Sequence, residues 1–527
     1  MLMLDIVNLP CYAETMIAKT YSIVPDGFGG SVIEVEGDLK SGLPGFNIVG
    51  MANKTVSEAR ERVKSAIKSS SFSFPDKKLT INLAPADQEK DSTHLDVAIA
   101  LNILILTEQL RQEDVADSAF VGELSLDGSI RPVNGIINIA EAAKEAGFKQ
   151  LFIPAKNFAQ GSLVKGIGLK CINSLSELYS YLKHQSALPV PEIVVKNTKT
   201  DVAAPTFDQI YGQDLAKRAL EIAVAGHHNI LLSGPPGTGK TMLAKAALNL
   251  LPPLTEPEQI SSTKIYSLSG LSSNVIVTRP FRAPHHTSSL AALIGGGPKA
   301  LPGDISLAHL GVLFLDELPE YPRPILEALR QPLEDRQVSI SRAKRRVTYP
   351  ADFMLIATMN PCPCGYLGDP NHPCTCTPSQ IQAYQKKLSG PFLDRVDLFV
   401  NVDRVSTSKL LNTTHQKASS THPDTSHIKD SILSAINAQR ARYSNQATYN
   451  ASLPTHQIAT LIPLSPPEKS FLDAAANSLN LSARSYFKTI KVARTIADLE
   501  GSSNIKQSHL AEALNFRKIP LEKTSSF

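Results

Sequence analysis

Tryptophan is absent from this chain of 527 residues, cysteine occurs only six times, and the formal net charge is only +4. A charge this small for the length says nothing by itself about binding to nucleic acid. Four of the cysteines fall between residues 362 and 376, so they are too few and too clustered for a secreted disulfide scaffold. The cysteine content therefore excludes a secreted protein that depends on a disulfide scaffold.

Long hydrophobic runs are also missing. The most apolar segment, residues 97–106, has ten residues and contains Asn102, whereas a membrane-spanning helix needs roughly 20 apolar residues. The first residues (MLMLDIVNLP) lack the basic stretch and the small-residue cleavage site of a secretory signal. No internal repeat is found. We therefore expect a cytoplasmic protein with no membrane partner.

The length predicts three or four domains. The strand and helix patterns along the chain predict an α/β multidomain protein. Residues 1–184 alternate strand and helix patterns, residues 185–205 are typical of a linker, and residues 206–404 carry the motifs described below. A connection rich in Ser, Thr and His covers 405–427, and residues 428–527 have helical periodicity. Strands are predicted at 21–25, 32–36, 79–83 and 151–154, and helices at 53–69, 134–146 and 484–498.

A phosphate-binding loop is the most specific motif. The sequence GPPGTGKT follows the apolar run 229–233 and precedes an amphipathic helix, so backbone N–H groups and the Lys240 ammonium converge on triphosphate oxygens. The Thr241 hydroxyl is placed to bind Mg²⁺. A glycine-rich turn without a ligand is the alternative. The predicted ATP-binding residues are Gly234, Pro235, Pro236, Gly237, Thr238, Gly239, Lys240 and Thr241.

Two acidic residues follow another buried run at 312–315. Asp316 is predicted to hold Mg²⁺ together with Thr241, and Glu317 to polarise the attacking water as a general base. For an isolated pair, a solvated strand end would be the better interpretation. Downstream of a phosphate-binding loop, the pair predicts hydrolysis of a nucleoside triphosphate.

Two polar residues complete the predicted mechanism. Asn360 follows a third buried strand, 353–358, and is predicted to contact the γ-phosphate or the attacking water. Arg395, in GPFLDR, is predicted to act as an arginine finger. The plainer alternatives are a strand-terminating turn before Pro361 and a surface salt bridge.

The clustered cysteines form two Cys-x-Cys pairs separated by a loop rich in Gly and Pro. Four thiolates at this spacing predict a structural Zn²⁺ site without an open coordination position, with free thiols or a redox pair as the alternative. The predicted ligands are Cys362, Cys364, Cys374 and Cys376.

A basic hairpin is predicted at residues 337–349, with the sequence RAKRR at its turn. Such a tip favours contacts to phosphates, although a solvated hairpin tip is the plain alternative. The predicted DNA-contacting residues of the hairpin are Arg342, Lys344, Arg345 and Arg346.

The motifs resemble those of a known family. The segment RPFRAPHHTSS at 279–289, the triplet GGG at 295–297, SLAH at 306–309 and VARTIADL at 492–499 resemble the ComM (YifB) family of Mg-chelatase-like AAA+ ATPases. The resemblance covers nearly the whole chain. It implies a homohexameric ring motor that drives branch migration of single-stranded and branched DNA during recombination in natural transformation, linked to a RecA-type recombinase.

The same resemblance assigns roles to residues. It implies that Asn360 is sensor 1, that Arg395 acts on the neighbouring subunit, and that Arg484 is the sensor 2 arginine, with Arg494 as the competing choice. It also implies that residues 292–311 and the basic hairpin line the pore, that Lys299 of this loop contacts DNA, and that the C-terminal helices form a lid.

The first domain resembles the Lon protease domain, of the ribosomal S5-type α+β fold, in the stretch GELSLDG and in Arg131-Pro-Val133. It departs from that family at the catalytic positions, because His94 stands near the nucleophile position, Ser92 is out of register, and an isoleucine of the stretch 134–137 stands near the lysine position. We therefore expect an inactive protease domain. A metal-chelatase subunit acting on a porphyrin is the alternative function, and a Lon-like protease is a weaker one.

Overall fold

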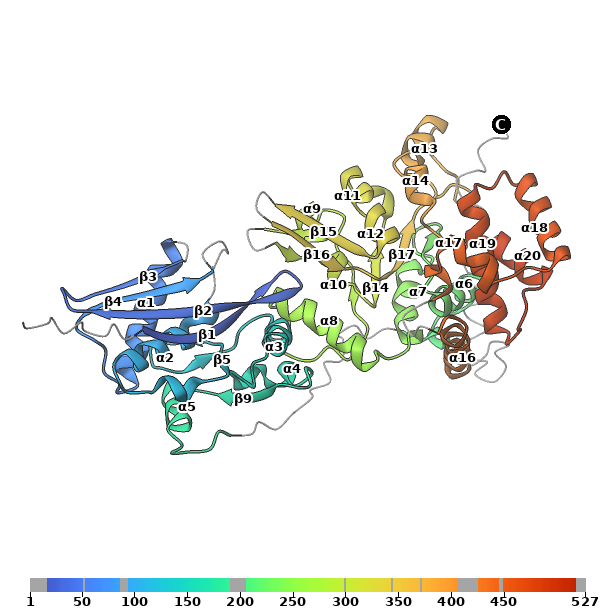
Figure 1. Cartoon of the computed structure of the whole chain (residues 1–527). Helices are drawn as coiled ribbons and strands as arrows, with labels where there is room; N and C mark the ends of the chain where they lie inside the picture. The colour runs from blue at the N-terminus through green and yellow to red at the C-terminus, as the bar shows by residue number, and fades with distance from the viewer. Residues whose placement is uncertain are drawn as a thin grey trace, which may run out of the picture. The chain divides into compact units, whose positions relative to one another are not determined.

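The computed structural model describes residues 17–50, 53–85, 93–189, 205–297, 300–342, 345–369, 372–404, 425–444 and 449–517. They form two compact units (Figure 1). Unit 1 comprises the described residues of Met1–Asn197 together with Thr263–Ile276, and unit 2 comprises those of Thr198–Ser262 and Val277–Phe527. None of the described helices combines the length and the apolar character needed to cross a bilayer.

The larger sheet of unit 1 has four strands in the order β1-β2-β4-β3. Alternate residues of β2 are buried, as the two-residue period of a strand with one covered face requires. Helix α2 packs against β1 and β2, and every one of its residues is buried, which accounts for the short apolar run in the sequence. The elements are β1 (Ile17–Asp26), β2 (Gly29–Lys40), β3 (Gly45–Val49), β4 (Lys78–Ala84), α1 (Asn53–Ser69) and α2 (Asp96–Leu106).

A second, three-stranded parallel sheet follows in the order β5-β8-β9. Residues 263–276 also belong to this unit: Ser267 Oγ accepts a hydrogen bond from Gly135 N at 3.1 Å, and Gln160 donates to the carbonyl of Ser272 at 2.9 Å. Composition alone did not indicate this placement. The remaining elements are β5 (Ser118–Phe120), β6 (Glu123–Leu124), β7 (Ile130–Arg131), α3 (Ile136–Glu145), β8 (Gln150–Pro154), α4 (Phe158–Gly161), β9 (Gly168–Ile172) and α5 (Leu175–Leu182).

Unit 2 contains a parallel five-stranded sheet in the order β11-β14-β17-β10-β18. The three central strands, β14, β17 and β10, are buried at every position, which explains why they are continuous apolar runs in the sequence. Helix α8 (Glu256–Ser269) begins in unit 2 and belongs to unit 1 from Thr263 on. The other elements are α6 (Asp214–Gly226), β10 (Ile230–Ser233), α7 (Lys240–Ala246), β11 (Phe281–Arg282), β14 (Val312–Leu315), α11 (Arg323–Ala328), α12 (Arg330–Asp335), β17 (Met354–Met359), α13 (Pro378–Gln385), α14 (Gly390–Leu393) and β18 (Leu398–Asn401).

Two insertions interrupt this α/β order. The first contains a short two-stranded ladder between two short helices, and the second is a hairpin of two six-residue strands. Tyr349 of the hairpin donates a hydrogen bond to the carbonyl of Ala300 at 2.9 Å, so the two insertions pack together. The elements are α9 (Leu290–Ile294), β12 (Gly295–Gly296), β13 (Leu301–Pro302), α10 (Asp304–Leu307), β15 (Gln337–Arg342) and β16 (Arg345–Pro350).

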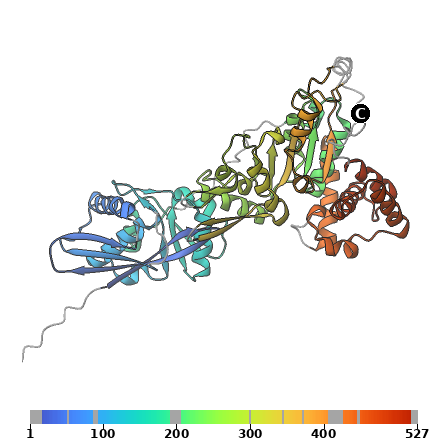
Figure 2. The same cartoon turned by 90° about the horizontal axis from the view of Figure 1, so that it is seen from above.

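The C-terminal part of unit 2 is helical, and its helices gather in one bundle, drawn in orange to red (Figure 2). Helix α19 packs against α16, α20 and α6, so its apolar face joins the same hydrophobic core as the sheet. The helices are α16 (Thr425–Tyr443), α17 (Thr455–Leu461), α18 (Pro466–Ser478), α19 (Ala483–Leu499) and α20 (Gln507–Asn515).

The helices and strands predicted from periodicity are present. The helix predicted at 53–69 is α1, and the strand predicted at 312–315 is β14 with the same bounds. The predicted mixed α/β content with a parallel sheet is confirmed. The assignment of a Lon-like domain, an ATPase core and a lid stays a prediction. Most of the predicted linker and of the polar connection lies outside the described residues.

Candidate nucleotide-binding site

The phosphate-binding loop lies between β10 and α7, as its sequence predicts. Gly237 and Gly239 have φ values of 78° and 84°, a left-handed conformation that glycine adopts without strain. The Lys240 ammonium donates to the carbonyls of Gly234 at 2.6 Å and Pro235 at 2.8 Å. Burial lowers the pKa of Lys240 to about 8, opposed by the nearby carboxylates of Asp316 and Glu317. A bound polyphosphate would favour the charged form of this lysine.

The acidic pair is connected to this loop by hydroxyl groups. Thr241 Oγ1 donates to Asp316 Oδ2 at 3.0 Å, and Thr358 Oγ1 donates to Asp316 Oδ1. The backbone N–H of Glu317 in turn donates to Thr358 Oγ1 at 3.2 Å. Glu317 has φ 52°, a left-handed conformation that is unusual for a residue with a side chain. The acidic residues are thus oriented by their neighbours, and a metal held by Thr241 and Asp316 fits this set of oxygen donors.

Asn360 follows β17 and accepts a hydrogen bond from the Lys240 ammonium at 3.2 Å through Oδ1. Lys240, Thr241, Asp316 and Asn360 therefore lie in one place although they come from three strand ends. The carboxyl ends of parallel strands meet at the same edge of a sheet, which is where α/β proteins bind ligands.

Sequence reasoning missed several residues of this site. Gln213, just before α6, donates to the carbonyl of Asp403 at 2.6 Å and to that of Thr238 in the loop at 3.5 Å. Tyr321 donates to the carbonyl of Pro284 at 2.6 Å, in a segment whose His285 and His286 line the same pocket as Asp316 and Glu317. The left-handed backbone and the pairings across the fold that create these contacts have no local signature.

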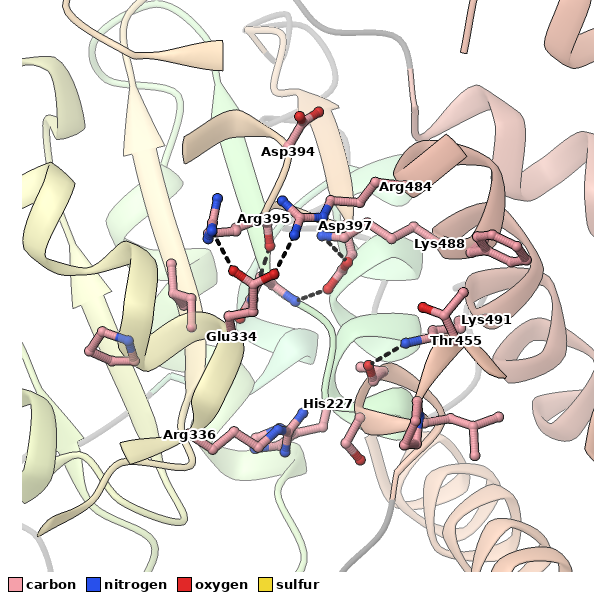
Figure 3. Close-up of a pocket in the computed structure, with 18 of the residues that line it drawn as sticks. His227, Glu334, Arg336, Asp394, Arg395, Asp397, Thr455, Arg484, Lys488 and Lys491 are labelled. Carbon is pink, nitrogen blue, oxygen red and sulfur yellow. Dashed lines mark hydrogen bonds and ion pairs between the residues drawn. The ribbon is translucent and has the colours of Figure 1, made fainter. Parts of the chain in front are cut away.

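Arg395 and Arg484 lie in a different pocket of unit 2, of about 560 Å³ (Figure 3). Both guanidinium groups form ion pairs with the carboxylate of Glu334, which sequence reasoning also missed. This pocket shares no lining residue with the one that contains Thr241, Asp316 and Glu317. The structure therefore brings the two predicted arginines together, in a pocket distinct from the one that contains the acidic pair.

The two candidates for the sensor 2 arginine have different surroundings. Arg494 is only 4% exposed, pairs with Asp498 at 2.9 Å and donates to the carbonyl of Ser503 at 2.8 Å. Arg484 is 42% exposed and points into the pocket of Figure 3. The contacts of Arg494 are thus internal to the helical bundle, whereas Arg484 faces the pocket; the choice of Arg484 as sensor 2 stays a prediction.

The four clustered cysteines converge as their spacing predicts. Their sulfur atoms all lie within 4.8 Å of one another, with Cys362 Sγ 3.7 Å from Cys374 Sγ and 3.3 Å from Cys364 Sγ. These separations fit four thiolates around one tetrahedral ion with bonds of about 2.3 Å. The cluster begins two residues after Asn360, so it lies directly beside the nucleotide site in the sequence.

The basic hairpin has one buried and one exposed face. Val338, Ile340, Val347 and Tyr349 are buried, whereas Arg346 is exposed. Arg342 and Arg345 are opposite each other in the ladder next to the turn. Lys299 and Lys344 lie outside the described residues.

The positions that would be catalytic in a Lon-type enzyme carry no matching groups among the residues described. Ile136 and Ile137 are fully buried apolar residues, and His94 Nε2 is 3.0 Å from the carbonyl oxygen of Asn134. Ser92 lies outside the described residues. An isoleucine cannot act as the base that such a mechanism needs, so the inactive assignment stays the better prediction.

A parallel sheet whose strand ends carry a GPPGTGKT loop, an Asp-Glu pair and an asparagine is the architecture of an AAA+ P-loop ATPase. Comparison with known families agrees. Residues 206–410 match the family described as magnesium chelatase, subunit ChlI, residues 35–157 match subunit ChlI of Mg-chelatase, and residues 422–517 match the C-terminal part of ChlI.

Among known proteins, the competence protein ComM of Haemophilus influenzae is 42% identical over 507 residues, which cover 95% of this chain and 97% of that protein. The protein YifB of Salmonella typhimurium is 40% identical over 496 residues, which cover 94% and 95%. The magnesium-chelatase 67 kDa subunit of Heliobacterium mobile is 30% identical over 186 residues, only 29% of this chain and 27% of that protein. The chain belongs to the ComM/YifB family of Mg-chelatase-like ATPases.

Proposed function

We propose that this protein is the subunit of a hexameric, ATP-driven DNA translocase that drives branch migration of recombination intermediates during natural transformation. The division of the nucleotide site carries the proposal. Lys240, Thr241, Asp316 and Asn360 form one half, whereas Arg395 and Arg484 lie in a separate pocket of the same subunit. In a ring of identical subunits, each interface joins the loop half-site of one subunit to the arginine half-site of its neighbour, so that every nucleotide site is complete.

In such a site the residues have separate tasks. The loop and Lys240 would bind the triphosphate, Thr241 and Asp316 would hold Mg²⁺, and Glu317 would polarise the attacking water. Mg²⁺, when bound, supplies neutralisation of charge on the phosphate oxygens. Arg395 of a neighbour would stabilise the charge that develops on the transferred phosphoryl group.

The two insertions support DNA as the substrate. The hairpin β15–β16 and the segment around β12 and β13 pack together through Tyr349 and Ala300. Because the hairpin turn is basic and Arg346 is exposed, this pair of insertions offers cations to a phosphate backbone without reading bases. Single-stranded and branched DNA are therefore the proposed substrates.

The role in competence comes from the relative that matches nearly the whole chain, whose name is competence protein ComM. The proposed reaction follows strand invasion, so a RecA-type recombinase is the expected functional partner.

The test is a branch-migration assay with purified protein and a three-strand intermediate. The wild-type protein should convert the intermediate in an ATP-dependent manner, and Lys240→Ala should abolish conversion because the loop loses its ammonium group. Lys429→Ala, at an exposed position on α16, is the matched control. A Lys240→Ala variant as active as wild type would show that ATP hydrolysis does not drive the reaction.

A magnesium-chelatase subunit is the second candidate, favoured by the three family matches that carry that name. The chelatase subunit itself, however, matches only 29% of this chain. ATPase activity that responds to a porphyrin and a chelatase partner, together with no binding of single-stranded DNA, would favour this candidate over the translocase.

We also propose that the four-cysteine cluster holds one structural Zn²⁺, since four thiolates leave no position for a substrate. Elemental analysis of freshly purified protein should find about one zinc per chain. Cys374→Ser with Cys376→Ser should lose it, whereas Cys171→Ser, at a buried cysteine in unit 1, should retain it. Zinc near zero in the wild-type protein would contradict the proposal.

A further inference from the structure

Glu334 bridges the two arginines of the second pocket. It lies near the end of α12, whereas Arg395 follows α14 and Arg484 is in the first turn of α19. One carboxylate oxygen of Glu334 pairs with Arg395 and the other with Arg484, as the dashed lines of Figure 3 show. Three elements that are distant in the sequence thus meet at one carboxylate.

Arg395 is held firmly and Arg484 loosely. The Nε group of Arg395 donates to the carbonyl of Arg330 at 2.9 Å and an Nη group donates to that of Pro391 at 2.5 Å, and its side chain is only 12% exposed. Within the described residues, Arg484 donates to Glu334 alone, and its side chain is 42% exposed. The direction in which Arg484 points therefore depends on Glu334.

The other cations that line this pocket have partners of their own. Lys488 pairs with Asp397 at 2.7 Å, Arg336 pairs with Asp352 at 2.5 Å, and Lys491 donates to the carbonyl of Ala451 at 3.1 Å. Glu334 is thus dedicated to the arginine pair. At 45% exposed, its side chain lies where an anion approaching from outside the subunit would meet both guanidinium groups.

We propose that Glu334 is a positioning residue of the half-site that each subunit offers to its neighbour. Two guanidinium groups repel each other, and one carboxylate between them removes this repulsion and aligns their N–H groups. The aligned pair then meets the triphosphate bound in the neighbouring subunit, whose phosphate oxygens accept the remaining N–H groups. This role rests on the proposed shared site, and it extends that site by a residue that does not touch the nucleotide itself.

The test is Glu334→Gln, which keeps the shape of the side chain and removes its charge. We expect the kcat of ATP hydrolysis to fall by roughly 10- to 100-fold, the range seen when a supporting residue is lost. The KM for ATP should change little, because the phosphate-binding loop of the same subunit is intact. Asp335→Asn, at the exposed neighbouring carboxylate on α12, is the matched control and should leave hydrolysis unchanged.

Mixed rings separate this role from a structural one. A Lys240→Ala subunit is inactive in its own loop but keeps its arginine pair, so mixing it with Glu334→Gln should restore hydrolysis at roughly a quarter of the interfaces of a random ring. Mixing Glu334→Gln with Arg395→Ala should not restore ATP hydrolysis, because both variants are defective in the same half-site.

Four results would overturn the proposal. Glu334→Gln alone at or above the wild-type rate would show that the carboxylate is not needed. Recovery with Arg395→Ala would place Glu334 in the other half-site. If mixing Glu334→Gln with Lys240→Ala restores no ATP hydrolysis, although mixing Arg395→Ala with Lys240→Ala does, the Glu334→Gln variant has a structural defect. If Arg395→Ala and Lys240→Ala also fail to complement each other, the shared site itself is wrong, and the role of Glu334 falls with it.

Discussion

At the scale of single residues, one hydroxyl organises the acidic half of the nucleotide site. Thr358 is fully buried, donates to Asp316 and accepts a hydrogen bond from the backbone of Glu317. Asp316 is half-buried and accepts from Thr358 through one oxygen and from Thr241 through the other, so the Thr358 hydroxyl helps to fix the orientation of the carboxylate that would hold a metal. Thr358 is thus a supporting residue that no motif indicates.

Replacing Thr358 with Val keeps the volume and removes the hydroxyl. We expect kcat for ATP hydrolysis to fall by roughly 10- to 100-fold, with a higher Mg²⁺ requirement, because Asp316 is no longer oriented. Steady-state hydrolysis at several Mg²⁺ concentrations checks this. Thr348→Val on the exposed face of the hairpin, where the hydroxyl meets only Ser339 among the residues described, should have no effect.

A second residue, His309, makes stability depend on pH. Its Nδ1 accepts a hydrogen bond from the backbone N–H of Asp352 at 3.1 Å, and its Nε2 faces Ser261 Oγ at 3.1 Å. Burial lowers the pKa of His309 to about 4, with Arg279 lowering it further and Asp352 and Glu258 opposing the shift. The folded protein therefore holds His309 in its neutral form.

Because the folded-state pKa lies below the ordinary 6.5, the unfolded chain binds more protons at His309 between pH 6.5 and 4. The free energy of unfolding should therefore be highest above pH 6.5 and fall towards pH 4, by up to roughly 3 kcal/mol from this residue. Chemical denaturation at several pH values should show a shallower fall for His309→Gln. The same slope in wild type and variant would contradict this, and exposed His456→Gln on α17 serves as the control.

At the scale of elements, the hairpin β15–β16 shows how a strand pattern selects one face for packing. Residues on one face, including Val347 and Tyr349, are buried, and the opposite face carries Arg346 and Thr348. A one-residue shift of register would exchange the two faces, so Arg346 is kept outward by the burial of its neighbours.

Charge reversal of Arg345 and Arg346 to Glu should therefore weaken DNA binding while leaving the fold intact. We expect the affinity for single-stranded DNA to fall at least tenfold at low salt. The slope of log affinity against log salt should become shallower by about 0.7 for each phosphate that the protein no longer neutralises. Fluorescence anisotropy across a salt series measures both. If Lys429→Glu with Lys469→Glu, at exposed positions on α16 and α18, weakens binding equally, the effect is one of overall charge and not of the hairpin.

At the scale of the whole molecule, the sheet and the C-terminal helices of unit 2 are joined by an ion pair between a buried carboxylate and a largely buried lysine. Lys488 of α19 pairs with Asp397 at 2.7 Å, and Asp397 also accepts a hydrogen bond from Asn229 N at 2.9 Å. Burial raises the pKa of Asp397, but Lys488 and His228 outweigh it and hold that pKa far below its usual range. Asp397 lies two residues after Arg395 in the chain, so this ion pair connects α19 to the pocket that contains Arg395 and Arg484.

Lys488→Met should leave a buried carboxylate without its partner and lower the free energy of unfolding of unit 2 by about 3–5 kcal/mol. Adding Asp397→Asn should recover part of this loss, because the two residues are coupled. Denaturant titration of the single and double variants checks the prediction. Lys469→Met, at an exposed position of α18, is the control. An equal loss of unfolding free energy in Lys469→Met and Lys488→Met would contradict the prediction.

Unit 1 is made of two separate segments of the chain, and composition alone did not locate the second one. Residues 263–276 lie within the stretch expected to form the ATPase core, yet Ser267, Ser272 and Asn274 bond to residues of unit 1. No shift in composition marks this segment, because its assignment depends on partners more than 100 residues away in the chain.

The sequence by itself determined the phosphate-binding loop, the acidic pair and the central strands, because each is a contiguous pattern whose geometry follows from local backbone preferences and hydrophobic period. It also indicated the cysteine cluster through its spacing. Only the tertiary structure decided that Thr358 orients Asp316, that Arg494 is internal, and that Glu334 joins Arg395 to Arg484. The reason is physical: Glu334 and Arg484 are 150 residues apart, and only the folding of unit 2 brings the charges of α12 and α19 together.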